Sequence, residues 1–408
     1  MKTLRVMVIT TVPQTLAAFF PRQLRSLADA GFDVHAVSSP GADLDAIGRI
    51  PGVTVHALPI ERQPHPLRDC RSLFQIFQLI RRIRPQIVHS HTPKAGLLGM
   101  AAAKAAGVPV RLYTIHGLPL ETRTGLWRRI LEAAERASAA LSTRSYAVSP
   151  SLRKVAIGLK LCPASKLSTL GAGSCAGVDL DRFNPVDRHI QRPLIRQSLS
   201  VPDHALLLSF VGRLSRDKGL GVLAQAWPEI ARQLPEAHLL LAGDPDPTDP
   251  LPAVTFSDLC AHPRVHFTGA IAANRVPAHY AATDIFVLPT FREGLSQVSL
   301  EAGAMGVPIV ATRVTGLDPV IDGVTGVLVP AGQSAPLADA IVALARNPSL
   351  RGQMSRAAQA SIATNFSAQQ VNQIWMDEYR QLVQESLPEL SQFGELSPVP
   401  APFENRST

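Results

Sequence analysis

The sequence predicts an α/β protein with two parallel β-sheets, one in each half of the chain. Short apolar runs rich in β-branched residues alternate with helix-like segments. The alternation restarts at Leu206, after a stretch at 171–197 that contains Gly and Pro and has no period. Strands that are apolar throughout are typical of parallel sheets covered by helices on both faces. We therefore expect two doubly wound domains that face each other across a cleft, with a hinge at 171–197.

In the first domain, residues 1–180, strands and helices are expected to alternate, except that no helix is expected between the second and third strands. The strands are expected at 4–9, 34–38, 53–60, 87–90, 110–116 and 146–149, and the helices at 14–30, 67–84, 95–106, 124–140 and 152–159. Gly31 suits the left-handed position that ends a helix, and the residue before Pro85 disfavours helical backbone. These positions mark the ends of the first two helices.

The second domain, residues 181–367, repeats the pattern. Strands are expected at 206–212, 238–242, 265–268, 285–289, 309–312 and 326–330, with helices between them. Helical stretches follow at 335–346 and 350–364, and a last helix is expected within residues 368–386. The tail at 387–408 is rich in Pro and Ser and has no period, so we predict that it is disordered.

The net charge of +8 is unevenly distributed. Residues 1–180 hold 23 Lys and Arg against 10 Asp and Glu, a balance of +13, and the rest of the chain is mildly acidic. A basic half favours anionic lipids or phosphorylated ligands, although a solvated basic surface is the alternative. Because aromatic residues are only 5% and do not interleave with the basic ones, we expect no nucleic-acid partner.

The cysteine pattern and the N-terminus indicate a cytoplasmic protein. The four cysteines lie far apart without the spacing of metal ligands, which favours reduced thiols. The apolar run at 2–10 is too short for a signal peptide, and no run reaches the 18 apolar residues of a membrane span. Any membrane association is therefore expected to be peripheral.

Two carboxylates stand eight positions apart in the segment 290–330. Glu293 lies on a Gly-containing turn after an expected strand, and Glu301 lies inside the helix that the turn opens. A helix start offers backbone N–H groups and a positive dipole to an anion, while carboxylates accept hydroxyl hydrogens. The pattern predicts a site for a phosphorylated sugar or nucleotide. A surface turn is the alternative for Glu293, but Glu301 stands among apolar residues, where a lone carboxylate is costly.

A second motif places Arg213 and Lys218 at a junction between a strand and a helix. A bidentate guanidinium and an ammonium can clamp a diphosphate and stabilise charge that develops on it as a leaving group. Taken alone, the motif also fits two solvated cations. Two further candidates, His116 and Lys94, follow strands of the first domain, at the sheet edge where ligands bind. A structural histidine and a solvated lysine are the alternatives.

A basic amphipathic helix is expected at 126–140, within the helical stretch that starts at 124. Its start carries three apolar and three basic side chains: Trp127, Ile130, Leu131, Arg123, Arg128 and Arg129. Such a helix can lie on an anionic membrane surface, or it can simply keep its charged face in water. Asp244 and Asp246 have the DxD spacing of a metal–nucleotide site, but the neighbouring prolines suit a plain turn. We therefore expect no metal and no other cofactor.

Together these motifs resemble the family 4 glycosyltransferases, which have two Rossmann-like domains in the arrangement called GT-B. The similarity runs from Leu4 to about Gln384, and its most specific part is the pair Glu293 and Glu301, continued by GVPIVAT and DGVTGVLVP. The segments HSHTPKAGLLGMAAAKAAGVPVRLYTIHGLP, SYAVSPSL and LGAGSCAGVDLDRFNP resemble the subgroup that builds bacterial capsular, O-antigen and related lipid-linked glycans. Many members have a Gly-Gly loop after the first strand, whereas residues 10–13 read TTVP here, so the resemblance assigns that loop no ligand.

The resemblance implies a role for each candidate residue. Glu293 would contact hydroxyls of the donor sugar, and Glu301 would contact the ribose. The donor diphosphate would be held by two cations and three backbone N–H groups, those of Arg213, Lys218, Gly294, Leu295 and Ser296. His116 would face the donor sugar from across the cleft, which makes His116 and Glu293 the candidate catalytic residues. Lys94 would lie on the acceptor side, and the helix from about Ala368 would cross back onto the first domain.

The expected activity is retaining, metal-independent transfer of a hexose or N-acetylhexosamine. The donor would be a nucleotide-diphosphate sugar, UDP-linked by resemblance, and the acceptor a lipid-diphosphate-linked glycan at the inner face of the plasma membrane. A nucleotide-sugar epimerase or hydrolase is an alternative, as is a non-catalytic nucleotide-sugar-binding protein.

Overall fold

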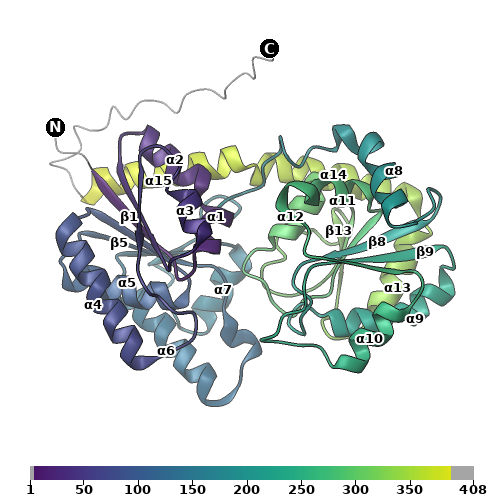
Figure 1. The fold of residues 1–408 in the computed structure, drawn as a ribbon, viewed down its shortest axis with the longest axis horizontal. Coiled ribbons are helices and arrows are strands. Elements are labelled where there is room, and N and C mark those ends of the chain that lie inside the picture. The colour runs from purple at the N-terminus through teal and green to yellow at the C-terminus, as the bar shows by residue number, and fades with distance from the viewer. Residues whose placement is uncertain (1–3, 387–408) are drawn as a thin grey trace, which may run out of the picture.

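The chain forms two α/β domains, each built on one parallel sheet (Figure 1). The structure, a computed structural model, describes residues 4–386, and the tail predicted at 387–408 lies outside them. The sheet of the front domain has the order β3-β2-β1-β4-β5-β6-β7, and that of the back domain has the order β10-β9-β8-β11-β12-β13. In each sheet the chain starts at the centre, moves to one edge and returns to the other side. This doubly wound topology confirms the predicted fold class.

Within residues 4–180, which the structure describes, the front domain contains seven strands and seven α-helices. The strands are β1 (Arg5–Ile9), β2 (Asp33–Ser38), β3 (Val53–Ala57), β4 (Ile87–His91), β5 (Val110–Ile115), β6 (Arg144–Ala147) and β7 (Leu167–Ser168). The helices are α1 (Pro13–Phe19), α2 (Pro21–Asp29), α3 (Ala42–Ile47), α4 (Pro66–Ile83), α5 (Pro93–Ala105), α6 (Gly125–Leu141) and α7 (Pro150–Gly158), with a 3₁₀ turn, η1, at Pro119–Thr122.

The back domain contains six strands and seven α-helices, and a last helix follows it. The strands are β8 (Leu206–Val211), β9 (Ala237–Ala242), β10 (Val265–Gly269), β11 (Ile285–Leu288), β12 (Ile309–Thr312) and β13 (Gly326–Val329). The helices are α8 (Arg188–Ser198), α9 (Leu220–Gln233), α10 (Ala253–Ala261), α11 (Val276–Ala282), α12 (Gln297–Ala304), α13 (Ser334–Ala345) and α14 (Pro348–Phe366), and the last helix is α15 (Ala368–Ser386).

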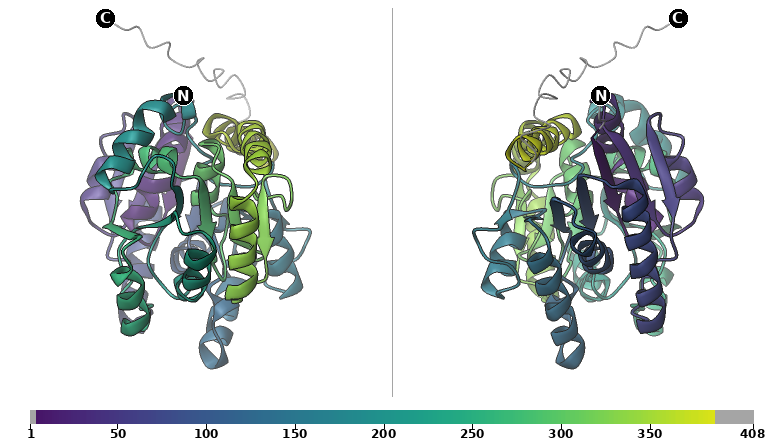
Figure 2. Two further views of the ribbon diagram at one scale, coloured as in Figure 1. Left: turned by 90° about the vertical axis from the view of Figure 1, so that its right-hand side faces the viewer. Right: turned by 90° about the vertical axis from the view of Figure 1, so that its left-hand side faces the viewer.

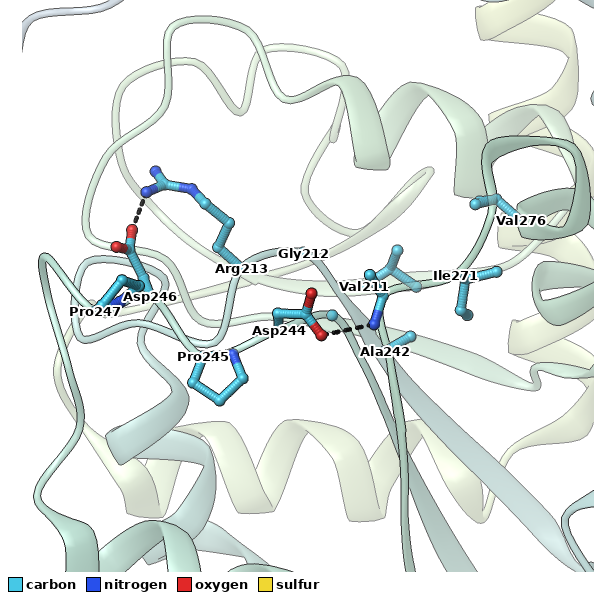
Figure 3. A pocket seen from close by; sticks show the side chains of 12 residues that line it. Val211, Gly212, Arg213, Ala242, Asp244, Pro245, Asp246, Pro247, Ile271 and Val276 are labelled. Atoms are coloured by element: carbon cyan, nitrogen blue, oxygen red, sulfur yellow. Dashed lines mark hydrogen bonds and ion pairs between the residues drawn. The ribbon is translucent and has the colours of Figure 1, made fainter. Parts of the chain in front are cut away.

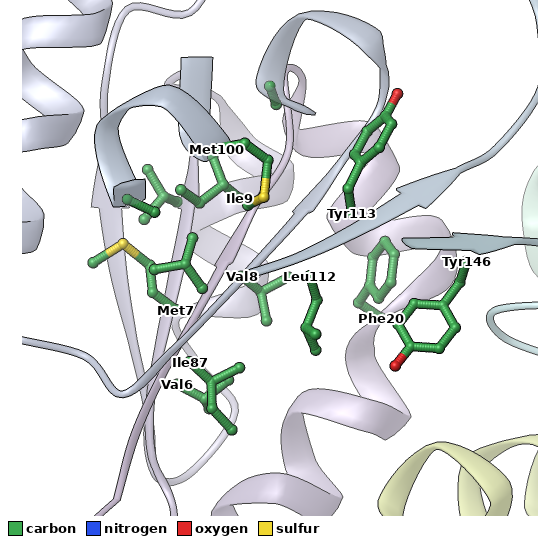
Figure 4. Close-up of a cluster of buried hydrophobic side chains, with 14 of the residues drawn as sticks. Val6, Met7, Val8, Ile9, Phe20, Ile87, Met100, Leu112, Tyr113 and Tyr146 are labelled. Carbon is green, nitrogen blue, oxygen red and sulfur yellow. The ribbon is translucent and has the colours of Figure 1, made fainter. Parts of the chain in front are cut away.

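The central strands are buried on both faces. Figure 4 shows β1 crossing the front core, where four consecutive side chains, from Val6 to Ile9, are fully buried. Ile87 of β4 and Leu112 of β5 pack beside them. Consecutive burial is possible because helices cover both faces of the sheet, which is why the strands are apolar throughout rather than alternating.

Two predicted segments differ from the structure. The helix expected at 14–30 is two helices, α1 and α2, because Pro21 has no N–H and its ring opposes a continuous helix. The stretch at 171–197, expected to lack regular structure, contains α8. Arg196 of α8 is fully buried, pairs with Asp284 at 2.5 Å and donates to the carbonyl of Ala205 at 2.8 Å. The buried contacts of Arg196 therefore help to stabilise this helix.

The two connections between the domains lie side by side. The N–H of Val178 donates to the carbonyl of Phe366 at 2.8 Å, and the N–H of Ala368 donates to the carbonyl of Val178 at 2.8 Å. A Cβ on Gly177 would lie 2.7 Å from the carbonyl oxygen of Phe366, so only glycine permits this approach. The predicted hinge stretch and the start of α15 are thus joined by main-chain hydrogen bonds.

The last helix, α15, packs on the front domain. Figures 1 and 2 show α14 and α15 following each other along one side of both domains. Trp375, Met376 and Tyr379 are buried in the front core, and the Tyr379 hydroxyl contacts Nδ1 of His89 at 2.7 Å. The chain therefore ends its described part on the domain with which it began. None of the helices within residues 4–386 is both long and apolar enough to cross a bilayer.

Candidate active site

The carboxyl ends of the two sheets meet at a seam. The front side of the seam consists of residues 116–122 and 149–151. The back side consists of residues 292–296 and 315–318. The hydroxyl of Ser149 donates to the carbonyl of Gly294 at 2.7 Å. A Cβ on Gly294 would lie only 1.7 Å from the carbonyl oxygen of His116. The loop that carries the predicted acid Glu293 is therefore in direct contact with the front domain.

Lys218 and Glu293 form an ion pair at the back side of the seam. Lys218 Nζ lies 2.6 Å from Glu293 Oε1, and both side chains are largely buried. Gly219, with φ of 73°, allows the two loops to meet, because a Cβ there would lie 1.8 Å from the carbonyl oxygen of Pro289. The fold thus brings together a cation and an acid that were predicted from separate motifs.

Arg213 is held at the edge of this region by Asp246. The side chain of Arg213 is 54% exposed, and its guanidinium contacts the buried carboxylate of Asp246 (Figure 3). Hydrogen bonds from Thr248 and the charge of Arg213 hold the pKa of Asp246 below its usual range. Asp244 accepts from the N–H of Ala270 at 2.9 Å. Residues 244–246 lie in a loop, and in addition the two acids of this loop orient Arg213 and a neighbouring loop.

A hollow of about 370 Å³ lies at the carboxyl ends of β8, β9 and β10. Figure 3 shows it between the loop of Gly212 and Arg213 and the loop of Asp244 to Pro247, with Ile271 and Val276 at its far end. Its lining consists mostly of Gly, Ala, Pro, Val and Ile residues, and its charged members are Arg213, Asp244 and Asp246. Such a hollow suits a flat, partly apolar group whose polar edge meets main-chain atoms.

The start of α12 contributes backbone N–H groups to the seam. Ser296 is the N-cap residue, and its hydroxyl accepts from the N–H of Ser299. The N–H of Ser296 itself donates to the carbonyl of Gly316 at 3.0 Å. Those of Gly294 and Leu295 donate no hydrogen bond within residues 4–386. Two of the three N–H groups predicted to bind phosphate are therefore available, and the third is used to hold the loop at 315–318.

Glu301 lies on α12 with partners around its carboxyl group. Burial raises its pKa to about 7, and the charge of Arg182 opposes this shift. The neighbouring side chains of Gln297 and Tyr280 donate to the carbonyls of Gly177 and Val298. The expectation that a carboxylate in this apolar helix needs partners agrees with these neighbours. A carboxyl group with this pKa can both donate to and accept from hydroxyl groups near neutral pH.

His116 turns its ring into the front domain. Its Nε2 lies 2.9 Å from Nδ1 of His91, and its Nδ1 lies 3.7 Å from the sulfur of Cys175. Burial lowers the pKa of His116 to about 4, so the ring is neutral near pH 7. Since the carbonyl oxygen is the part directed at Gly294, His116 contacts the back domain through its backbone.

Lys94 is engaged within the front domain. Its ammonium pairs with Asp69 at 2.6 Å and donates to the carbonyl of Gln63, and its side chain is 13% exposed. Both partners belong to the front domain and not to the seam. An acceptor role for Lys94 would require it to leave these partners.

Comparison with known proteins identifies the family. The profile described as "Glycosyl transferase 4-like domain" matches residues 15–173, and the profile described as "Glycosyl transferases group 1" matches residues 205–347. The capsular polysaccharide biosynthesis glycosyltransferase CapM of Staphylococcus aureus is 31% identical over 379 residues, which cover 90% of this chain and 95% of CapM. This chain belongs to the glycosyltransferase family that these two profiles describe.

Other relatives and solved structures agree with this assignment. A D-inositol 3-phosphate glycosyltransferase of Arthrobacter is 30% identical, covering 82% of this chain and 81% of the relative. An Escherichia coli UDP-Gal:alpha-D-GlcNAc-diphosphoundecaprenol alpha-1,3-galactosyltransferase is 27% identical over 61% of this chain and 63% of the relative. Sucrose-phosphate synthase of Thermosynechococcus elongatus has the same GT-B fold, with a TM-score of 0.79, 22% identity and coverage of 94% and 100%. Anabaena HepE in complex with UDP has a TM-score of 0.74, 20% identity and coverage of 93% and 100%.

Several seam residues of this glycosyltransferase were not found from the sequence. Ser151 accepts from the N–H of Gly316 at 2.8 Å, and its own N–H donates to Asp318 at 2.9 Å. From the other side, Thr315 donates to Glu121 at 2.7 Å. The segment SYAVSPSL contains the end of β6, and this position could have indicated that Ser149 and Ser151 lie at the ligand edge of the sheet. Their partners, more than a hundred residues away, left no local signal.

A resident metal was not expected, and its absence stays a prediction. Among residues 4–386, no three His, Cys, Asp or Glu side chains converge as metal ligands would. The four cysteines, Cys70, Cys162, Cys175 and Cys260, form no disulfide.

Proposed function

We propose that this glycosyltransferase transfers a hexose or N-acetylhexosamine, with retention and without a metal, from a UDP-sugar to a lipid-linked glycan. The observation that carries the proposal is the ion pair of Lys218 and Glu293 beside the N–H groups of Gly294 and Leu295. Positive charge, free N–H groups and an acid within one loop cluster match a diphosphate joined to a sugar. Arg213 supplies a second cation at the edge of the same cluster.

In this proposal the nucleotide lies along the carboxyl edge of the back sheet. The base occupies the hollow beside Gly212 and Ile271, and the ribose hydroxyls contact Glu301. The diphosphate lies on the N–H groups of Gly294 and Leu295, and Lys218 turns from Glu293 toward it. Glu293 then accepts hydroxyl hydrogens of the donor sugar. Uridine is supported by the name of the Escherichia coli relative and by the UDP complex of HepE, whose fold is the same.

The transfer step breaks the bond between C1 of the sugar and the diphosphate oxygen. The acceptor oxygen forms the new bond to C1 on the same face, and its proton passes to the departing phosphate oxygen. Lys218 and Arg213 stabilise the charge that develops on the diphosphate, which is the main contribution of such groups to catalysis. The backbone of His116 forms the front wall of the sugar site.

A lipid-linked acceptor is supported by the names of the relatives and by the surface of α6. CapM is named for capsular polysaccharide, and the Escherichia coli relative is named for a diphosphoundecaprenol substrate. At the start of α6, at the bottom of the front domain in Figure 1, Leu126, Trp127 and Ile130 are exposed. Arg129 is exposed beside them, so this end of the helix suits an anionic membrane surface at the inner face of the plasma membrane.

The test is a transfer assay with UDP-glucose, UDP-galactose, UDP-N-acetylglucosamine and UDP-N-acetylgalactosamine. The acceptor probe is a short-chain prenyl diphosphate that carries N-acetylglucosamine. Lys218→Ala should lower kcat/KM by roughly a hundredfold or more, since loss of one group that stabilises developing charge costs that much. Glu293→Gln should also lower kcat/KM, because the amide nitrogen cannot accept a hydroxyl hydrogen of the donor sugar. Arg216→Ala is the matched control, because Arg216 is an exposed cation two positions from Lys218 that pairs with Asp249.

Product analysis separates the alternatives. The proposal expects free UDP, an elongated acceptor with the anomeric configuration of the donor, and full activity in EDTA. An altered nucleotide sugar formed without acceptor would instead indicate an epimerase, and UDP with free sugar alone would indicate a hydrolase. Full activity of Lys218→Ala would contradict the proposed site, and loss of activity in EDTA would contradict metal independence.

A further inference from the structure

Glu121 of η1 crosses the seam from the front domain. Its Oε2 accepts from the hydroxyl of Thr315 at 2.7 Å. Its Oε1 is fully enclosed, yet no group within residues 4–386 donates a hydrogen bond to it. One carboxylate oxygen therefore has a partner in the back domain, and the other has none.

An enclosed carboxylate oxygen without a donor is costly. Burial raises the pKa of Glu121, and this shift is opposed by the hydrogen bond from Thr315 and by the charges of Arg292 and Arg128. Oε1 gives up its hydration and gains no hydrogen bond in return. Such an atom between two domains of an enzyme marks a place where a ligand can supply the missing hydrogen bond.

The neighbours of Glu121 connect it to the candidate donor site. The adjacent Thr122 accepts from Nε of Arg292 at 3.0 Å, and Arg292 pairs with Asp217 at 2.5 Å. Arg292 precedes Glu293 in the chain, and Asp217 precedes Lys218. In addition, the carbonyl of Thr315 accepts from the N–H of Glu293 at 3.0 Å. Glu121 thus lies one contact away from the loop of Glu293.

The domain to which Glu121 belongs indicates which substrate it would meet. The back domain supplies Glu293, Glu301, Lys218 and Arg213 for the nucleotide sugar, so the donor hydroxyls already have acids assigned. Glu121 approaches the loop of Glu293 from the front domain. The acceptor sugar must reach the donor sugar from this same side. A carboxylate oxygen suits one hydrogen of a sugar hydroxyl.

We propose that Glu121 positions the acceptor sugar by accepting a hydroxyl hydrogen at Oε1, while Oε2 remains bound to Thr315. This inference rests on the proposed function. Because Oε1 is enclosed where the domains meet, the acceptor binds when the domains separate and is held when they close. The hydrogen bond forms only with an acceptor present, so closure is favoured by the complete pair of substrates.

A simple tether between the domains is the competing explanation, and two substitutions separate it from the proposal. In Glu121→Gln the amide oxygen can keep the hydrogen bond from Thr315, while the NH₂ group replaces Oε1 and cannot accept. Thr315→Val removes the partner of Oε2 and leaves Oε1 intact. The first variant therefore tests positioning, and the second tests the tether.

The experiment measures KM and kcat for both substrates in the wild type and the two variants, with the acceptor probe named above. Glu121→Gln should raise the acceptor KM about tenfold, as expected for loss of a hydrogen bond to a charged group. Its donor KM and its slow hydrolysis of donor without acceptor should match the wild type. Thr315→Val should raise the acceptor KM less than Glu121→Gln does, because Oε1 can still accept the hydroxyl hydrogen when only the partner of Oε2 is lost. Thermal melting checks that each variant is folded, and Glu121→Asp replaces Glu121→Gln if the latter is not.

The outcomes are distinct. An unchanged acceptor KM in Glu121→Gln would overturn the inference. Equal effects of the two substitutions on both substrates would overturn it as well. In either case, transfer by the wild type would still support the proposed function. If the wild type transfers no sugar from any of the donors, the proposed function fails and the inference fails with it.

Discussion

Gly294 lies where the backbone of one domain meets the backbone of the other. The space for a side chain at this residue is taken by the carbonyl group of His116, while its own carbonyl accepts from Ser149. A side chain at this position would push the front domain away from the loop that carries Glu293. The glycine is therefore required by the seam, in addition to the close approach of phosphate that its N–H permits.

Gly294→Ala should lower kcat by at least a hundredfold, because a misplacement of about 1 Å between reacting groups can cost that much. The same substitution should leave the melting temperature near that of the wild type, since each domain keeps its own core. The measurement is steady-state kinetics with a donor that the wild type uses. Gly158→Ala is the control, because a Cβ there meets no atom within 4 Å. If Gly294→Ala kept the kcat of the wild type, the close contact between Gly294 and the carbonyl of His116 would not be needed for catalysis.

The ends of β4 and β5 and the helix α15 enclose three histidines. The rings of His89 and His91 lie 4.0 Å apart, and His91 contacts His116. Tyr379 of α15 contacts Nδ1 of His89, and Thr114 contacts its Nε2 at 2.7 Å. Burial lowers the pKa of His89 to about 3 and that of His116 to about 4, and it also lowers that of His91. The packing of these elements therefore favours the neutral form of the three histidine side chains.

Acid should destabilise the fold through this cluster. The folded pKa of His116 lies below its ordinary value of 6.5, so the unfolded chain binds more protons as pH falls. The contribution of His116 to the free energy of unfolding is therefore complete above pH 6.5 and is lost toward pH 4, roughly 2 kcal/mol of it by pH 5. Denaturant unfolding between pH 7 and pH 5 measures this loss.

The comparison with His116→Asn isolates the effect from that of the buried carboxyl groups. Burial raises the pKa of Glu135 and Glu301 to about 7, so these groups change stability in the opposite direction over the same range. Both carboxyl groups are present in the wild type and in His116→Asn, so their contributions cancel when the stabilities of the two proteins are subtracted at each pH. The variant should lose less stability than the wild type as pH falls. Equal losses would mean that His116 does not titrate below its ordinary pKa.

The distribution of charge over the whole molecule bears on where it works. The excess of basic residues lies in the front domain, and the exposed apolar start of α6 lies on the same domain. In the proposed function this domain also receives the lipid-linked acceptor. A membrane surface bound by α6 would place that acceptor on the front side of the seam, while the donor enters from the back domain.

Binding to anionic vesicles should therefore occur at low salt and weaken as salt rises, because exposed charges are screened. Trp127→Ala combined with Arg129→Glu should reduce binding, since both the apolar and the basic contribution are lost. Phe267→Ala is the control, because Phe267 is 44% exposed on the back domain, compared with 57% for Trp127. Vesicle flotation measures the bound fraction. No binding at low salt, or an equal loss in the control, would contradict the role of α6.

Local patterns along the chain were sufficient for the two sheets, and they indicated acids and cations that lie at the carboxyl ends of the strands. Apolar strand runs, helix periods and residues such as Gly31 and Glu293 report on their own neighbourhood, and these predictions needed no knowledge of distant partners. Two elements show the limit of predicting helices from local patterns. The break between α1 and α2 depended on a single proline, Pro21, and helix α8 depended on the burial of Arg196.

The seam could be described only from the folded chain. The pairing of Lys218 with Glu293, the contact of Glu121 with Thr315 and the inward turn of the His116 ring join residues that are far apart in sequence. Their partners are selected by the packing of one domain against the other, which no window of neighbouring residues contains. The ion pair of Asp246 with Arg213 was not foreseen for the same reason, because Arg213 lies on another loop. Periodicity therefore revealed which residues carry charge at the sheet edges, and long-range packing determined what each of them contacts.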